Sequence, residues 1–390
     1  MSQFLTIGLT IICTLIYLGF LFYLSVYWEK AFRGKFPRSK YIIRAAIIIL
    51  GALPLISTVN FIWHPDIPNI EALAFGGFIV SALFLYIAMF MVITHFLVLF
   101  FTKVLHKGKW CQRTLGRMCL IASEIIFSLL FCIFGVWGAN HLSVSEIDIG
   151  SGPTALKVVA LSDIHYGTPG STVNLDKMAT QINAQNPDLV LIAGDVFDYN
   201  TNNRSNEEFA AAMQKIKATY GVYAINGNHE YYENNHQDIE RYYRHTGVNL
   251  LVDEAVEIDG LLRVAGRDDL GYISNTQKSR QPLEAILAQS DQELPLIVLD
   301  HQPQDYREAK DNGALLQISG HTHNGQIWPG DILVRMIYKI AYNCPSDGIH
   351  SSDGFSLAIT RGYGTWGFPM RSTGSSQILC FNLGESVFNR

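Results

Sequence analysis

Hydrophobic residues divide the chain into two parts with different patterns. Before about residue 140, long apolar runs follow one another at Phe4–Trp28, Ala45–Trp63, Ala72–Phe101 and Met118–Asn140. A helix of about 20 apolar residues can cross a bilayer core roughly 30 Å thick, so each run predicts a transmembrane helix. Only His95 and Glu124 interrupt the runs with ionisable groups, which either serve a function, reach the membrane surface or pair with one another.

Beyond the fourth run the pattern changes to short apolar runs that alternate with helix-like stretches. Two of these stretches are "NLDKMATQINAQ" and "NEEFAAAMQKIKATY", at residues 174–185 and 206–220. The alternation predicts a layered α/β domain. We therefore expect a four-span transmembrane region at 1–140 and a globular domain at 141–390, with 143–155 as a linker or a first edge strand.

Composition and loop charge support this division. The 390 residues are 49% hydrophobic and 16% charged, as expected for membrane helices joined to a globular domain. Two loops, 29–44 and 103–117, carry the basic residues Lys30, Arg33, Lys35, Arg38, Lys40, Arg44, Lys103, Lys107, Lys109, Arg113 and Arg117. Basic loops stay in the cytoplasm, so we expect an integral multi-pass membrane protein whose globular domain lies on the extracytoplasmic side.

Charge and cysteine usage exclude some functions. Residues 1–140 hold 11 Lys and Arg against 4 Asp and Glu, which leaves 18 against 30 for the globular part. Such an acidic domain is a poor nucleic-acid binder, and no nucleic-acid partner is expected. No CxxC pair supplies a thiolate zinc site. Cys344 and Cys380 could pair in an oxidising compartment, or could be buried thiols.

Candidate ligands follow five of the apolar runs in the globular part. Each run ends in carboxylate, carboxamide or imidazole side chains with glycine nearby, and the carboxyl ends of strands in an α/β sheet converge on one crevice. One such turn would be ordinary turn chemistry, but five predict a metal site. Nitrogen and oxygen ligands without thiol suit Mn, Fe, Co or Zn. The side chains are Asp163 and His165; Asp195 and Asp198; Asn228, His229 and Glu230; Asp300 and His301; and His321 and His323.

The ordered motifs "DIH", "GDVFD", "GNHE", "LDHQP" and "GHTHNGQ" resemble the motif series of the calcineurin-like metallophosphoesterases, over about Lys157–Gln326. The tail "TRGYGTWGFPMR" resembles that of membrane-linked bacterial members. The resemblance implies a layered β-sheet sandwich flanked by helices and, with the four apolar runs, a place in a bacterial inner membrane.

The same resemblance implies a site and a reaction. Two divalent metal ions (Mn, Fe, Zn or Co) and a bridging hydroxide nucleophile would hydrolyse a phosphoric monoester, diester or pyrophosphate. His229 would be the catalytic residue that protonates the leaving oxygen. The implied ligands are Asp163, His165 and His323 for one ion, Asn228, His301 and His321 for the other, and Asp195 as the bridge.

Several neighbours have two interpretations. Asp198, Asp300 and Asn324 could orient imidazoles or cap turns. Arg267 and Arg361 are candidate substrate-binding residues, and Arg371 could join them, although arginines more often pair at the surface. Tyr363, Trp366 and Phe368 could form a lip that faces lipid, or could simply pack.

The bilayer anchor favours a lipid-linked or other amphiphilic phosphate ester as substrate. Some relatives cleave UDP-diacylglucosamine at its pyrophosphate, but that lipid belongs to the cytoplasmic face, so the charge pattern counts against it. One rival hypothesis is a transporter or sensor with a regulatory metal- or phosphate-binding domain; another is a structural anchor without turnover. A complete ligand set with His229 beside it favours an enzyme.

Overall fold

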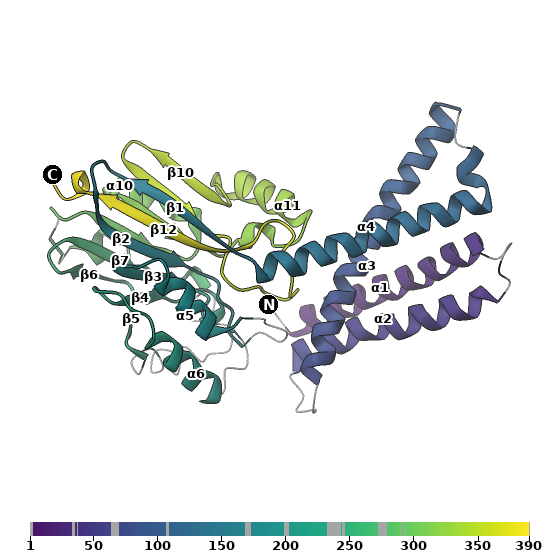
Figure 1. The fold of residues 1–390 in the computed structure, drawn as a ribbon, viewed down its shortest axis with the longest axis horizontal. Coiled ribbons are helices and arrows are strands. Elements are labelled where there is room, and N and C mark those ends of the chain that lie inside the picture. The colour runs from purple at the N-terminus through teal and green to yellow at the C-terminus, as the bar shows by residue number, and fades with distance from the viewer. Residues whose placement is uncertain are drawn as a thin grey trace. The chain divides into compact units, whose positions relative to one another are not determined.

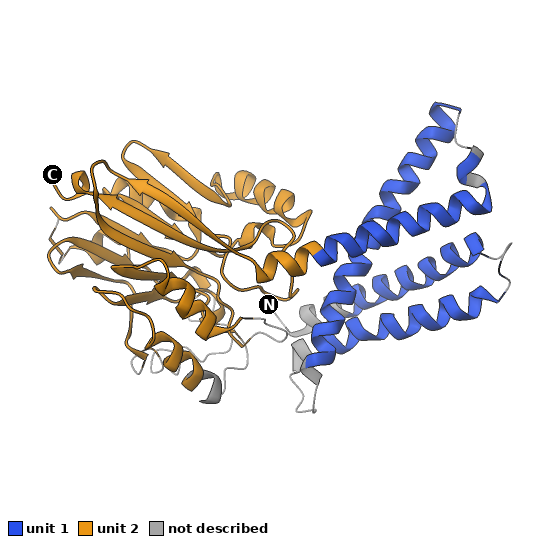
Figure 2. Cartoon of the chain, viewed as in Figure 1, with its two compact units in different colours: residues 1–133 blue, residues 134–390 orange. Residues whose placement is uncertain are grey.

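The computed structural model describes residues 3–32, 36, 38–63, 70–106, 109–167, 173–198, 203–231, 243, 246–271, 279–288, 290, 291 and 293–389. The chain forms two compact units, Met1–Ile133 (unit 1) and Phe134–Arg390 (unit 2), shown in Figures 1 and 2. The division of function between 1–140 and 141–390 stays a prediction.

Four long helices contain the four apolar runs. They are α1 (Gln3–Phe32), α2 (Ser39–Trp63), α3 (Ile70–Leu99) and α4 (Thr114–Asn140), with the short helical segments η1 (Phe100–Val104) and η2 (Lys109–Gln112) between α3 and α4. All four are long and apolar enough to cross a membrane, which confirms the expected helices. The last turns of α4, from Phe134 onward, belong to unit 2.

The two ionisable groups of the spans find separate partners. Glu124 is fully buried and accepts hydrogen bonds from the hydroxyls of Tyr27 and Thr94. The ring of His95 lies 2.7 Å from the carbonyl of Met91 through Nδ1 and 3.3 Å from the hydroxyl of Tyr23 through Nε2. Hydrogen-bonding groups of α1 and α3 therefore lie against both side chains.

Unit 2 contains two six-stranded sheets. The first has the order β1-β12-β2-β3-β4-β5, and the second has the order β10-β11-β9-β8-β7-β6. In the first sheet β2, β3, β4 and β5 run parallel, and in the second β7, β8, β9 and β11 do. The strands are β1 (Leu142–Ile149), β2 (Thr154–Leu161), β3 (Leu189–Ala193), β4 (Val222–Ile225), β5 (Val248–Leu250), β6 (Glu254–Ile258), β7 (Leu262–Gly266), β8 (Leu296–Leu299), β9 (Leu316–Ser319), β10 (Gly348–Ser352), β11 (Phe355–Ile359) and β12 (Ser376–Gly384).

Alternate residues of the central strands pack on opposite faces. In β2, Val158 and Ala160 join a core that also holds Ile297 and Leu299 of β8, so this core lies between the two sheets. Val159 of β2 points to the other face. This period of two, with both faces buried, explains why the strands appear in the sequence as continuous apolar runs.

Helices cover the outer faces. Met178 and Phe209 bring α5 (Leu175–Asn183) and α6 (Asn203–Met213) into the outer core of the first sheet. Leu283 and Ala309 bring α9 (Leu283–Leu287) and α10 (Tyr306–Asp311) against the second sheet. The layered sandwich flanked by helices is confirmed. The remaining helical segments are η3 (His229–Tyr231), η4 (Pro303–Asp305), η5 (His323–Gly325), α11 (Gly330–Ile337), η6 (Tyr338–Tyr342) and η7 (Glu385–Val387).

Two open alternatives are decided by the fold. Most of 143–155 is strand β1, which pairs in parallel with β12 at the edge of the first sheet. Cys344 and Cys380 are both buried free thiols, and they lie in the outer cores of different sheets. Burial raises the pKa of Cys344 to about 12 and that of Cys380 to about 11, so both stay protonated and unreactive at neutral pH.

Candidate metal centre

The polar side chains that follow five strands meet at one edge of the sandwich. Strands β2, β3 and β4 of the first sheet end at Leu161, Ala193 and Ile225, and β8 and β9 of the second end at Leu299 and Ser319. The loops begin directly after these ends and are bonded to one another, since the Asp163 amide donates to the Gly194 carbonyl and the Gly320 amide to the His301 carbonyl. The seven predicted ligands and His229 are all buried or nearly so.

The backbone in these loops is left-handed at the residues that carry the side chains. Asp163, His165, Asp195, His321 and His323 have φ angles of 50°, 48°, 52°, 69° and 49°. Residues other than glycine rarely adopt this conformation, and each instance costs of order 1–3 kcal/mol unless the surroundings enforce it. Five together show that the fold holds these side chains in one arrangement at the expense of local stability.

Glycines permit the close approach of the loops. A Cβ atom at Gly227 would collide with the carboxylate of Asp195, and one at Gly320 would collide with the carboxylate of Asp163. The space at Gly227 cannot be widened cheaply, because a Cβ atom there would also collide with the backbone nitrogen of Asp195. The glycines in "GNHE" and "SGHTHNG" are therefore required for packing around the acidic side chains.

The first group of side chains is Asp163, His165 and His323. The two imidazole Nε2 atoms lie 3.0 Å apart, and Oδ1 of Asp163 lies 3.3 Å from Nε2 of His323 and 4.0 Å from Nε2 of His165. The Ser162 hydroxyl donates to the other oxygen of Asp163. Three ligand atoms within 4.8 Å of one another could hold a metal ion.

The second group is Asp195, His301 and His321, with Asn228 beside it. Oδ2 of Asp195 lies 3.2 Å from Nε2 of His301, and Oδ1 of Asn228 lies 2.7 Å from Nδ1 of His321. Oδ2 of Asp195 is also 3.7 Å from Nε2 of His165, which links the two groups. Asp195 thus occupies the position between them that a bridging ligand requires.

The tautomer of His301 makes a strong case for a cation. Its Nδ1 lies 2.7 Å from the carbonyl of Ala193, and a carbonyl only accepts, so Nδ1 carries the proton. In a neutral ring the Nε2 lone pair then faces the Asp195 carboxylate with no hydrogen-bond donor between them. Two buried acceptors 3.2 Å apart need a positive charge, either a second proton on the ring or a metal ion.

The pKa values of Asp195 and His301 also indicate that positive charge is needed between these two side chains. Burial alone would raise the pKa of Asp195, but His301, His229 and His165 hold it well below its usual range. Burial alone would lower the pKa of His301, but Asp195 and Asp163 raise it well above the ordinary value. By contrast, burial and neighbouring cationic groups lower the pKa of His321 to about 3 and hold the pKa of His323 well below its ordinary value, so both rings are neutral, as metal ligands must be.

His229 differs from the other imidazoles in its surroundings. Its Nδ1 lies 3.0 Å from Oδ1 of Asp198, and its Nε2 lies 4.0 Å from Asp195. Burial alone would lower the pKa of His229, but Asp195 and Asp198 outweigh it and raise the pKa to about 9. The ring is therefore charged at neutral pH and can donate a proton. Asp198 orients an imidazole, which was one of its two expected roles.

Glu230 has a larger structural role than its motif suggested. Its carboxylate is buried and accepts hydrogen bonds from four backbone amides, those of Asp195, Val196, Phe197 and Gly227. One side chain therefore holds the loop after β3 against the turn after β4. The spacing of three residues between Gly227 and Glu230 was a signal for such a turn, but the bonds to the preceding loop could not be read from it.

The candidate substrate-binding arginines have different positions. Arg267 is buried and pairs with Asp300 at 3.3 Å and with Glu308 at 2.8 Å. Asp300 also accepts from Arg280, which the sequence did not single out, so this carboxylate binds two arginines instead of an imidazole. Arg361 is half-buried and lies against Gly374. Contact of either Arg267 or Arg361 with substrate stays a prediction.

Arg371 connects His323 to the end of α4. Its guanidinium is fully buried and donates to the carbonyls of His323 and Gly364, and its own amide donates to the carbonyl of Gly135 at 2.7 Å. A side chain in this position supports the loop and is not exposed to a headgroup. Asn324 also forms hydrogen bonds within these loops. Its side-chain amide donates to the carbonyl of Thr373, and its backbone amide donates to the hydroxyl of Thr322, which caps the turn.

The glycine-rich tail contributes both packing and an exposed aromatic ring. Tyr363 is buried, and its hydroxyl donates to Gln181. Trp366 is 44% exposed, and its ring stands edge-to-face to His229 with centroids 5.7 Å apart. Of the three aromatic residues considered for a lip, Trp366 is the one that is both exposed and beside the candidate centre.

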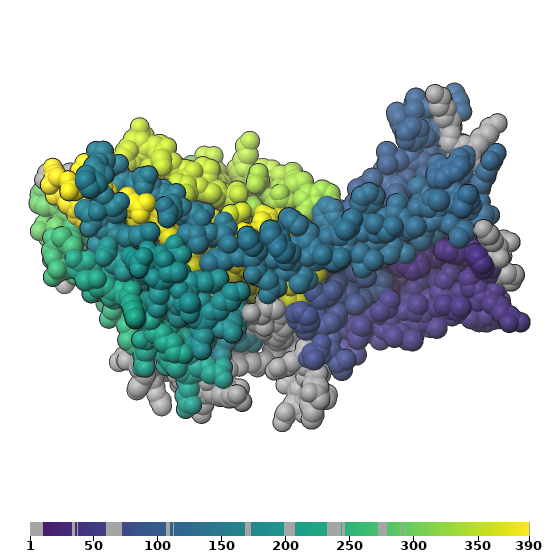
Figure 3. Space-filling model, viewed as in Figure 1, coloured from purple at the N-terminus to yellow at the C-terminus, as the bar shows by residue number. Residues whose placement is uncertain are grey.

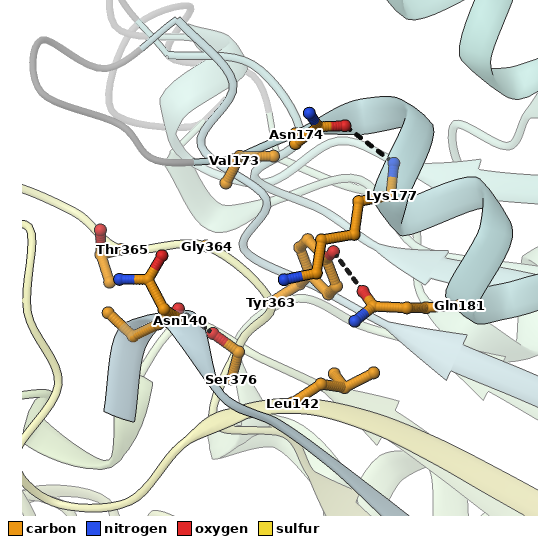
Figure 4. Close-up of a pocket in the computed structure, with 11 residues that line it drawn as sticks. Asn140, Leu142, Val173, Asn174, Lys177, Gln181, Tyr363, Gly364, Thr365 and Ser376 are labelled. Carbon is orange, nitrogen blue, oxygen red and sulfur yellow. Dashed lines mark hydrogen bonds between the residues drawn. The ribbon is translucent and has the colours of Figure 1, made fainter. Parts of the chain in front are cut away.

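A cleft lies elsewhere in unit 2, between α5, the tail and the start of β1 (Figure 4). It encloses about 40 Å³ and is lined by Lys177, Gln181 and Tyr363 among others, and by none of the seven predicted ligands. This volume holds little more than one or two water molecules. The cleft is therefore not where a phosphate ester would react.

Comparison with known proteins identifies the family. The family model of the calcineurin-like phosphoesterases matches residues 156–325. A metallophosphoesterase of Aquifex aeolicus is 32% identical over 225 residues, which cover 56% of this chain and 81% of that protein. The chain belongs to the calcineurin-like phosphoesterase family. It is a metal-dependent hydrolase of phosphoester bonds.

Two further relatives cover part of the helical region as well. A metallophosphoesterase of Campylobacter jejuni is 27% identical over 365 residues, 92% of this chain and 94% of that protein. A transmembrane protein with a metallophosphoesterase domain from Danio rerio is 27% identical over 301 residues, 71% of this chain and 66% of that protein. The phosphoesterase described here is thus a membrane-associated member, with four candidate spans before its catalytic fold.

Proposed function

We propose that the phosphoesterase binds two divalent cations, Mn, Fe, Zn or Co, at the candidate centre. Asp163, His165 and His323 would bind one ion, Asn228, His301 and His321 the other, and Asp195 both. The observation that carries this assignment is the pair of buried acceptors formed by Nε2 of His301 and Asp195, which needs a positive charge that a metal ion would supply. The neutral rings of His321 and His323 are suited to the same role.

Bound in this way, the two cations would supply positive charge to the attacking and leaving oxygens of an in-line displacement and would activate a water near neutral pH. The protein's own residues would protonate the leaving oxygen and hold the carboxylates in place. His229 would donate its proton from Nε2 to the leaving oxygen, while Asp198 holds Nδ1 and keeps the ring oriented. The loops of Gly227 and Gly320 would keep the carboxylates at fixed spacing.

We further propose an amphiphilic phosphate or pyrophosphate ester as the substrate, presented on the extracytoplasmic side of a bacterial inner membrane. The basic loops 29–44 and 103–117 support this orientation. Tethering by four apolar helices keeps the domain within reach of lipids at all times. Arg361 is the better placed of the two candidate arginines to contact a headgroup, because it is half-buried while Arg267 is already paired.

The test is a hydrolysis panel with the purified full-length protein in detergent and in vesicles. Metal content is measured first, and two equivalents of Mn or Zn per chain are expected. Phosphomonoesters, diesters, nucleotide pyrophosphates and phospholipids are then compared at equal concentration. Metal-dependent turnover of one class would support the proposal. Two tightly bound equivalents without turnover of any ester would instead favour a metal-binding sensor.

A further inference from the structure

Helix α11 and the turn η6 that continues it are apolar on two sides. Val334 and Tyr338 pack into the outer core of the second sheet. At about 100° per residue, the residues on the opposite side form one continuous stripe. These side chains face solvent and are 50%, 59%, 54%, 45% and 78% exposed at Ile332, Leu333, Met336, Ile337 and Ile340.

Exposed apolar side chains are concentrated on this segment. Among the described residues of unit 2, eleven large apolar side chains are exposed, and six of them lie in Ile332–Tyr342. Two others, Phe134 and Trp137, are on the last turns of α4. Single exposed apolar residues are normal on soluble proteins, but a stripe of this kind marks an interaction surface.

The segment begins close to the end of a candidate membrane span. The last turns of α4 are both part of the span Thr114–Asn140 and part of unit 2. The amide of Arg371 donates to the carbonyl of Gly135 at 2.7 Å, and the neighbouring Ser372 hydroxyl accepts from the amide of Trp328 at 2.8 Å. Trp328 is two residues before α11, and Figure 1 shows α11 and the end of α4 at the same end of unit 2.

Charge on the segment also matches a lipid surface. Arg335 and Lys339 are exposed and lie on one flank of the apolar stripe, and Tyr342 ends the segment. Among the described residues, Arg335 pairs with the partly exposed Asp347 at 3.4 Å. Cations and an aromatic ring beside an apolar stripe are typical of helices that lie in the membrane interface. Figure 3 shows the segment, coloured yellow-green, at the molecular surface.

We propose that Gly330–Tyr342, the interfacial segment, inserts its apolar stripe into the leaflet next to the end of α4. A second copy of the chain could also cover an apolar stripe, but the flanking cations favour anionic lipid, and the anchor holds lipid at high local concentration. The segment follows the loop of His323 directly, and Gln326 of that loop bonds both the amide and the carbonyl of Trp366, whose ring lies against His229.

The inference deepens the proposed function and rests on it for one consequence. If the interfacial segment lies in the leaflet, the candidate centre opens beside the lipid headgroups. The substrate would be a phosphate ester whose apolar tail stays in the bilayer while its head reaches the metal ions. Hydrolysis of a bilayer-embedded ester should then depend on the stripe, and hydrolysis of a small soluble ester should not.

Insertion is measured without any turnover. Leu333→Cys is labelled with an environment-sensitive dye in full-length protein whose exposed or half-exposed Cys13, Cys111 and Cys119 are replaced by serine. The protein is reconstituted at low density in phosphatidylglycerol–phosphatidylcholine vesicles. The control site is Lys217→Cys, an exposed position before β4 and thus at the end of the sheet away from the candidate centre. We expect bromine-labelled lipid to quench the dye at position 333 and not at position 217.

The activity arm compares two substrates. The triple variant combines Leu333→Ser, Met336→Ser and Ile340→Ser. Its rate on a vesicle-embedded phosphate ester should fall about tenfold or more, because three apolar contacts with lipid are removed. Its rate on a soluble aryl phosphate should stay within about twofold, which also shows that it folds. The control variant Val144→Ser, Ile349→Ser, at exposed apolar positions outside the stripe, should change neither rate.

The outcomes separate the two proposals. Iodide in the aqueous phase quenches a dye that is exposed to water, so equal iodide quenching at positions 333 and 217 would overturn insertion. Protection of position 333 from iodide that appears only at high protein density would also overturn insertion, since it indicates that a second copy covers the stripe. Lipid quenching at position 333 in a protein that hydrolyses no ester would support insertion and refute the proposed function. Lipid quenching with equal loss of both substrates in the triple variant would refute the link between insertion and substrate choice.

Discussion

The carboxylate of Asp195 shows what determines the centre at the scale of single residues. Its Oδ2 atom lies within 4.0 Å of the Nε2 atoms of His301, His165 and His229, at 3.2, 3.7 and 4.0 Å. Its Oδ1 atom accepts from the amide of His229. Two of these rings have a second partner, since His301 bonds the carbonyl of Ala193 and His229 lies 3.0 Å from Asp198, so Asp195 is the group that the three imidazoles share.

Replacing this carboxylate should disrupt both ion sites together. In Asp195→Asn we expect metal content to fall toward zero and hydrolysis to fall by about a thousandfold or more, because the charge shared by two cations is lost. The matched control is Asp176→Asn, which removes an exposed carboxylate paired with Lys215. Metal analysis and turnover check the result; an Asp195→Asn variant with two bound ions and a normal rate would contradict the assignment of Asp195.

His229 should affect the leaving group and not the metal. His229→Gln should keep the metal content and slow alkyl phosphates more than aryl phosphates, by about 10²-fold or more for the poorer leaving group. The pKa of the ring is raised to about 9, so the proton is present at neutral pH and is lost as the pH rises through about 9. Alkyl-ester hydrolysis by the unmodified enzyme should therefore decline above that pH, and the variant should lack this alkaline decline.

A uniform loss on both ester classes in His229→Gln would show that the ring has no role in protonating the leaving group. A loss of bound metal in the same variant would place His229 among the ligands. Either result can be distinguished from misfolding by measuring the thermal midpoint of the variant beside that of the unmodified protein.

At the scale of elements, the turn after β4 has almost no spare space. Gly227→Ala places a methyl group against the carboxylate and backbone of Asp195. We expect metal affinity to weaken by about 10- to 100-fold, as for other changes that displace a ligand without removing it. Gly76→Ala in α3 is the control, because a Cβ atom there meets nothing within 4 Å. Isothermal titration with Mn checks the difference, and equal affinity in both variants would contradict it.

Some of the strands and helices could be predicted from the sequence alone, and others could not. Buried strands and their polar ends were predictable, because central strands of a layered domain are continuous apolar runs and ligands follow their ends. The helix expected at 206–220 instead ends at Met213. Asn183 bonds the carbonyl of Lys215 and the amide of Lys217, and these bonds replace the next helical turn. A side chain more than thirty residues away cannot be inferred from local periodicity.

Among the site residues, the same limit applies to Arg371, Glu230 and Arg280. Each acts through bonds to backbone or carboxylate groups distant in sequence, so nothing in its immediate neighbours indicates its role. The interfacial segment was also missed, because an apolar helix of ordinary length has the same sequence pattern whether its second face meets protein or lipid.

For the whole molecule, the bound ions should contribute to stability as well as to chemistry. A ligand that binds only the folded state at about 1,000 times its dissociation constant stabilises that state by about 4 kcal/mol. Chelation should therefore lower the thermal midpoint of unit 2, where buried Asp163 and Asp195 would be left close together. Calorimetry with and without added Mn checks this; an unchanged midpoint after complete metal loss would contradict it.

The bond between Arg371 and Gly135 has a consequence for any attempt to excise the enzyme. A soluble fragment that starts at Ser143 loses a carbonyl that anchors the peptide of Arg371, the residue whose guanidinium supports His323. It also loses the Ala139 carbonyl that accepts from Ser376. Such a truncated protein would be weakened at the loop of His323 even if its sheets were intact, because the last turns of a candidate membrane span help to hold that loop.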